Sequence, residues 1–156
     1  MRVIVSALAG PLLAAAASSV SAAHAVPDSV TGWAEGAQLF TGLGSFHRQV
    51  TTSVPLAQDY FDQGMRLLWA FNQDEAARSF AYAAKLDPAC ASCFWGFALV
   101  VGPNYNYRTM DAVRARVAAE ALERARTEAA GAAPVEQALI AALAAQGLGW
   151  SGGGRA

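Results

Sequence analysis

The sequence has few residues of the kinds that perform chemistry. Its 156 residues include two cysteines and two histidines, and 15% are Asp, Glu, Lys or Arg. No carboxylate pair, glycine-rich phosphate loop or nucleophile motif stands out, so we expect no enzymatic activity and no cofactor. The formal net charge is −1, which gives no electrostatic footprint for nucleic acid or for an anionic membrane surface.

Strand-like alternation of apolar and polar residues is also missing. Apolar residues recur instead at helical spacing, which predicts helices over 56–71, 74–86, 89–101, 112–130 and 134–146. Pro55 suits the first turn of a helix, whereas Pro88, Gly102 and Gly131 suit the ends of helices. The sequence therefore predicts an all-α fold.

The first 25 residues have the order of features of a secretory signal peptide. Arg2 precedes an apolar run from Val3 to about Ala17, and small residues follow that end in an A-x-A pattern at Ala25. The apolar run is short for a membrane span. We expect cleavage near Ala25 and a mature protein that is periplasmic or secreted, with no membrane association after cleavage.

The remaining chain divides by composition into three parts. Residues 26–52 contain glycines that interrupt every candidate element, so this segment is expected to be irregular. Residues 53–146 hold the periodic apolar pattern and are expected to form the helical domain. Residues 147–156 have no periodicity and are expected to be a disordered tail.

Bulky and small residues alternate at fixed spacing within residues 57–88. They are Tyr60, Gly64, Leu67, Ala76, Phe80, Ala83 and Pro88. This pattern resembles the tetratricopeptide repeat (TPR), a pair of helices of about 34 residues. The resemblance implies antiparallel helices that approach closely at the small residues, with the bulky residues filling the space between them. Gln63 departs from the family pattern, which usually has leucine there.

The pattern continues incompletely after the first repeat. Phe94, Ala98 and Val101 restart the first-helix half, a loop is inserted, and the helix 134–146 would begin a third repeat. The stretch 47–106 is similar to the N-terminal part of larger exported bacterial TPR proteins. The resemblance implies a TPR-like α-solenoid of roughly one and a half to two and a half repeats. Because repeats bury their apolar faces only in arrays, we expect a truncated product or a fragment of a longer protein.

Cys90 and Cys93 form a C-x-x-C pair that has several interpretations. They share a helix face with Phe97 and would pack there as small apolar residues, or they would form a local disulfide in an oxidising compartment. Thiol catalysis usually has a βαβ setting, which is absent, and haem attachment needs a histidine where Phe94 stands. A soft-metal site would combine both thiolates with His47.

TPR arrays line their concave surface with the first helix of each repeat. In this register the concave residues are expected to be Gln58, Phe61, Met65, Leu68, Trp69, Trp95 and Leu99. Either they form an open groove for an apolar or helical peptide segment, or the segment 26–52 or a neighbouring repeat covers them. The leading prediction is a non-enzymatic scaffold that binds a protein or peptide, or a second copy of itself. The alternative is a periplasmic C-x-x-C protein for thiol redox or soft-metal binding.

Overall fold

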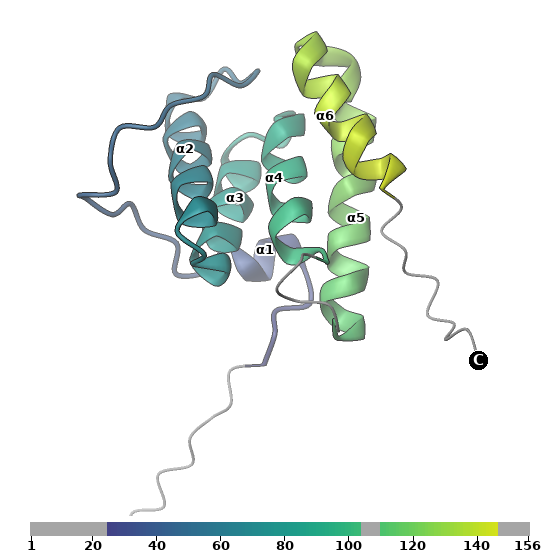
Figure 1. Cartoon of the computed structure of the whole chain (residues 1–156), viewed down its shortest axis with the longest axis horizontal. Helices are drawn as coiled ribbons and strands as arrows, with labels where there is room; N and C mark the ends of the chain where they lie inside the picture. Colours follow the sequence, from purple (N-terminus) through teal and green to yellow (C-terminus); the bar gives the residue numbers. More distant parts are fainter. Residues whose placement is uncertain (1–24, 104–109, 147–156) are drawn as a thin grey trace, which may run out of the picture.

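The computed structural model describes residues 25–103 and 110–146, which form a set of packed helices (Figure 1). These are α1 (Val30–Trp33), α2 (Pro55–Trp69), α3 (Gln73–Leu86), α4 (Ala91–Val101), α5 (Ala112–Glu128) and α6 (Pro134–Ala145), with a 3-10 turn at Ala129–Gly131. The described ranges contain no strand, and the predicted all-α class is confirmed. Each predicted helix is present, with ends displaced by at most two residues.

Several sequence-based expectations fall on other parts of the chain. The predicted signal peptide, apart from Ala25, and the predicted tail at 147–156 lie outside the described residues. Within the described residues, no helix combines the length and apolar character that crossing a bilayer requires.

Local chemistry explains where the long helices begin. Pro55 and Pro134 occupy the first turns of α2 and α6. Proline has no backbone N–H, but at this position an N–H would have no acceptor within the helix. Asp111 caps α5, because its carboxylate accepts a hydrogen bond from the N–H of Arg114 at 2.8 Å. Asp74 and Glu75 lie in the first turn of α3, where negative charge interacts favourably with the helix dipole.

Phe80 lies at the centre of the helix packing. A Cβ added to Gly64 of α2 would lie 2.7 Å from the Phe80 ring, and one added to Gly96 of α4 would lie 2.6 Å from it. Only glycine therefore allows α2 and α4 to approach α3 this closely. Phe61 completes the cluster, with its ring centroid 5.5 Å from that of Phe80 in an edge-on arrangement.

The residues that carry the TPR resemblance lie mostly in this core. The buried ones are Tyr60, Gly64, Leu67, Ala76, Phe80 and Ala83, whereas Pro88 is exposed in the turn between α3 and α4. Burial, reinforced by Tyr82, raises the pKa of the Tyr60 phenol. Consecutive helices from α2 to α6 contact each other, and α4 also contacts both α2 and α6.

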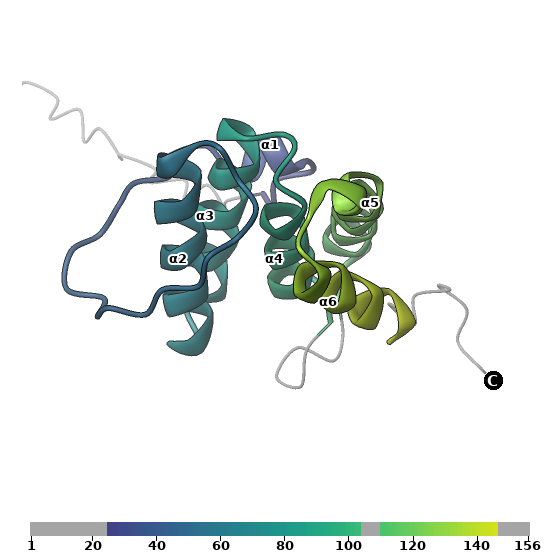
Figure 2. The same cartoon turned by 90° about the horizontal axis from the view of Figure 1, so that it is seen from above.

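The segment that precedes α2 contains one short helix. Trp33 of α1 is buried, and its ring packs edge-on against Phe97 of α4 with the centroids 6.1 Å apart. After α1 the chain has no regular secondary structure until Pro55. Figure 2 shows this dark blue segment looping away beside α2 and returning across it. We call residues 38–53 the strap.

Candidate functional site

The strap is attached to the helices mainly through its backbone. Gly42 and Gly44 have φ angles of +80° and +81°, a left-handed conformation that glycine adopts without strain and that lets the loop reverse direction. Leu39, Phe40 and Phe46 expose much of their side chains, whereas Val50 is buried. Burial of strap side chains is therefore limited, and polar contacts fix its path.

Two glutamines of α2 bind the strap in the same way. The Gln63 side chain donates to the carbonyl of Gln38 at 2.8 Å and accepts from the N–H of Phe40 at 2.7 Å. The Gln58 side chain donates to the carbonyl of Arg48 at 2.9 Å and accepts from the N–H of Val50 at 3.0 Å. An extended chain presents the C=O of one residue and the N–H of the second residue after it on the same side. Each glutamine thus binds one such pair.

Asp62 and Arg66 bind the strap between these two points. The Asp62 carboxylate accepts from the N–H of Arg48 at 3.0 Å and lies 2.6 Å from Nδ1 of His47. The Asp62 side chain is buried, whereas more than half of the His47 side chain is exposed. Arg66 donates to the carbonyl of Phe46 through Nε at 2.9 Å and Nη2 at 2.6 Å. The helix therefore supplies both donors and acceptors to the strap backbone.

Glu136 of α6 binds the end of the strap. Its carboxylate is only 2% exposed and accepts from the N–H and the hydroxyl of Thr51, at 3.0 and 2.6 Å, and from the hydroxyl of Ser92. Gln58, Ser92 and Glu136 lie in the first turns of α2, α4 and α6. The residues that bind the strap thus lie along α2 and in the first turn of α6, and Ser92 of α4 holds the Glu136 carboxylate in place.

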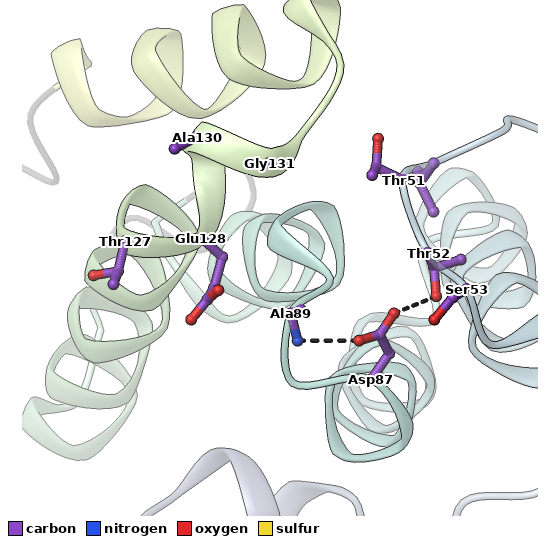
Figure 3. A pocket seen from close by; sticks show the side chains of 10 residues that line it. Thr51, Thr52, Ser53, Asp87, Ala89, Thr127, Glu128, Ala130 and Gly131 are labelled. Carbon is purple, nitrogen blue, oxygen red and sulfur yellow. Dashed lines mark hydrogen bonds between the residues drawn. The ribbon is translucent and has the colours of Figure 1, made fainter.

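A cavity of about 600 Å³ opens beside the end of the strap (Figure 3). Asp87 lies at its edge, where its carboxylate accepts from the Thr52 hydroxyl and from the N–H of Ala89. The lining residues are Val50, Thr51, Thr52, Ser53, Asp87, Ala89, Thr127, Glu128, Ala130 and Gly131. The strap end, the α3–α4 turn and the α5–α6 turn therefore surround a space with many hydroxyl groups.

The expected concave residues divide by burial. Phe61, Met65, Trp95 and Gln58 are buried, Leu68 and Leu99 are partly buried, and Trp69 is 67% exposed. An open apolar groove is therefore absent at Phe61, Met65 and Trp95. Phe61 is covered because it packs into the helix core against Phe80, not because it faces a partner. Of this set, the strap contacts Gln58.

Cys90 and Cys93 form a disulfide with an S–S distance of 2.03 Å. Both residues are 0% exposed, so the pair is bridged and also packed in the core. Cys90 is the N-cap of α4, and its sulfur accepts a hydrogen bond from the N–H of Cys93 at 3.2 Å. His47 contacts Asp62, and in the described part of the chain no three His, Cys, Asp or Glu residues form a group suited to a metal ion.

Sequence reasoning named Gln58 but missed the other strap-binding residues. In the sequence, Gln63 stands out only as a departure from the TPR pattern, and Asp62 and Glu136 do not stand out. The sequence feature that could identify these residues is a polar side chain at a helix position that the apolar periodicity assigns to the core. Glu136, for example, is the single charged residue of α6. Comparison of the chain with protein-family models, curated proteins and solved structures found no significant match.

Proposed function

We propose that the protein is an exported, TPR-like scaffold that binds a segment of another polypeptide and catalyses no reaction. The observation that carries this proposal is the strap itself. Gln58, Asp62, Gln63 and Glu136 hydrogen-bond to the backbone of a non-helical segment, an arrangement suited to peptide recognition.

The helix arrangement supports the same proposal. Consecutive helices pack with the Phe80 ring against two glycines, in keeping with close packing at the small positions of a helical repeat. Gln58 of α2 and Glu136 of α6 bind neighbouring residues of the strap, and helical-repeat proteins use surfaces formed by several helices for binding. In this proposal the signal peptide is removed near Ala25, and the scaffold acts in the periplasm or outside the cell.

The C-x-x-C alternative receives less support. Thiol–disulfide exchange requires a thiolate to reach one sulfur of the pair, and both Cys90 and Cys93 are fully buried. We therefore assign this disulfide a structural role in the proposal, at the start of α4.

Site-specific photo-crosslinking in producing cells tests the scaffold function. A benzophenone amino acid would replace Trp69 or Leu99, which retain exposed surface on the first helices α2 and α4. We expect a discrete crosslinked species from at least one of these positions. Ala119, exposed on α5, is the control position and should give none. An absence of adducts at both test positions, or equal adducts at all three, would contradict the proposal.

A further inference from the structure

The strap occupies the surface that the proposed scaffold would use. Resting on that proposed function, we infer that the strap is an internal occupant of the binding site, and that the partner is an extended segment carrying a basic side chain. This segment replaces the strap on Gln58, Asp62 and Glu136 and makes the same backbone hydrogen bonds.

The contacts do not depend on the side chains of most strap residues. Gln58 binds a carbonyl and an N–H, Asp62 binds an N–H, and Glu136 binds the N–H of Thr51. Any extended segment presents the same groups. Once the strap leaves, water binds these polar side chains, and a second segment that makes the same hydrogen bonds replaces that water as the strap did.

Asp62 determines the preference for a basic residue. Its side chain is 6% exposed, and one carboxylate oxygen lies 2.6 Å from the imidazole of His47. Asp59, one turn earlier, adds a second carboxylate on the exposed side of α2. A carboxylate at a largely buried position is stabilised by a cationic donor, so lysine, arginine or protonated histidine is favoured at this point of the partner.

The strap exposes one buried side chain of its own when it leaves the helices. Val50 is the buried strap residue, and the reversing loop contains Gly42 and Gly44. The α1 helix packs on α3 at one end of the segment, and Pro55 begins α2 at the other. The released strap therefore remains tethered and competes with the partner at a high effective concentration. The apparent affinity of the partner is therefore its intrinsic affinity multiplied by the fraction of molecules in which the strap has left the site.

A titration with the strap sequence as a separate peptide tests the inference. The probe is a fluorescein-labelled peptide of residues 45–54, SFHRQVTTSV. The receptor is the full mature chain with residues 38–52 replaced by a Gly/Ser segment of equal length that has proline at the positions of Phe40, Arg48, Val50 and Thr51. Proline lacks the backbone N–H that the side chains of α2 and α6 bind at these four positions. Fluorescence anisotropy should show at least tenfold tighter binding to this strap-replaced variant than to the wild type. Val50→Ser, which weakens the strap by a single change, should give a smaller gain.

Two modified peptides separate backbone recognition from non-specific adhesion. N-methylation at the positions of Arg48 and Val50 removes the N–H groups that donate hydrogen bonds to Asp62 and Gln58, and it should abolish binding of the peptide. Replacing His47 and Arg48 of the peptide by alanine should weaken binding at least tenfold.

Failure of the inference is distinguishable from failure of the proposed function. A strap-replaced or Val50→Ser chain with unchanged helical circular dichroism that does not bind the peptide would overturn the inference. Equal binding of the N-methylated peptide would also overturn it. If crosslinked species still form at Trp69 or Leu99, the scaffold function stands and only the role of the strap is wrong. If they do not form, both are wrong.

Discussion

At the residue scale, Phe80 decides how closely three helices pack. Gly→Ala changes inside helices normally stabilise, because alanine loses less backbone entropy on folding. At Gly64 and Gly96 the opposite is expected, since the new methyl group would overlap a fully buried ring.

Gly96→Ala should therefore destabilise the protein by about 1–3 kcal/mol, the usual range for an overpacked core. Urea denaturation followed by circular dichroism measures this change. Gly131→Ala is the matched control, because a Cβ there meets nothing within 4 Å, and it should leave stability nearly unchanged. A stabilised Gly96→Ala variant would show that the helices do not approach as described.

The disulfide is the second feature at this scale. Replacing both Cys90 and Cys93 by alanine should cost about 1 kcal/mol per site, because each change removes a small buried side chain. The loop that the disulfide closes is very short, so the entropic contribution of the bond should be small. Denaturation with and without reductant checks both statements. Insulin-reductase activity that the wild type shows and the double variant lacks would contradict the structural role.

At the element scale, the sequence predicted the long helices, and for the segment 26–52 it offered covering of the concave residues as one alternative, but it did not predict the path of the strap. Helix periodicity is a local signal, and Gly64 and Phe80, which are in close contact, lie within one helix pair formed by α2 and α3. The path of the strap depends on hydrogen bonds between residues far apart in sequence, such as Phe40 with Gln63 and Thr51 with Glu136. No periodic pattern encodes such contacts.

The concave face illustrates the same difference. The TPR register grouped Phe61 and Met65 with the concave residues and left open whether that face is an open groove or covered. In the structure both are buried, and Phe61 packs against Phe80 in the core. Gln63, which departs from the family pattern, supplies one of the bonds that hold the strap. The sequence shows that Gln63 departs from the pattern, but it does not show that Gln38 and Phe40 are the hydrogen-bond partners of Gln63.

Asp62→Asn should loosen the strap locally. Asparagine removes the negative charge next to His47 and one of the two acceptor oxygens. Losing a hydrogen bond to a charged group costs roughly 1.5 kcal/mol, which corresponds to about a tenfold larger population of the state in which the strap is detached from α2. Hydrogen exchange at residues 46–50 should accelerate accordingly.

Asp59→Asn, the same change on the same helix, is the control. Asp59 is exposed, so exchange in the strap should remain at the wild-type rate. If both variants accelerate exchange equally, general charge and not the Asp62 contact holds the strap.

At the scale of the whole molecule, Glu136 connects three parts of the chain. It binds Thr51 of the strap and Ser92 of α4 from its place on α6. Removing one partner of a buried, charged network leaves the other groups without hydrogen bonds, which costs more than the loss of a surface ion pair.

Glu136→Ala should lower the free energy of unfolding by about 2–3 kcal/mol. Thermal and urea denaturation give the value. Glu123→Ala, which removes an exposed carboxylate of α5, should change stability by less than about 0.5 kcal/mol. Equal effects at the two positions would mean that α6 is not fixed through Glu136.

The central claim is that α2 binds the backbone of an extended segment through its glutamine side chains. Nitrogen-15 NMR observes these side-chain amide groups directly. In the wild type, the Gln58 and Gln63 amide resonances should lie away from the positions of solvent-exposed glutamine, and in the strap-replaced variant both should move to those positions. The peptide of residues 45–54 should then restore the Gln58 resonance alone, because it contains Arg48 and Val50 but not the Gln63 partners Gln38 and Phe40. A Gln58 side-chain amide whose chemical shift changes neither on strap replacement nor on addition of the peptide would contradict the claim.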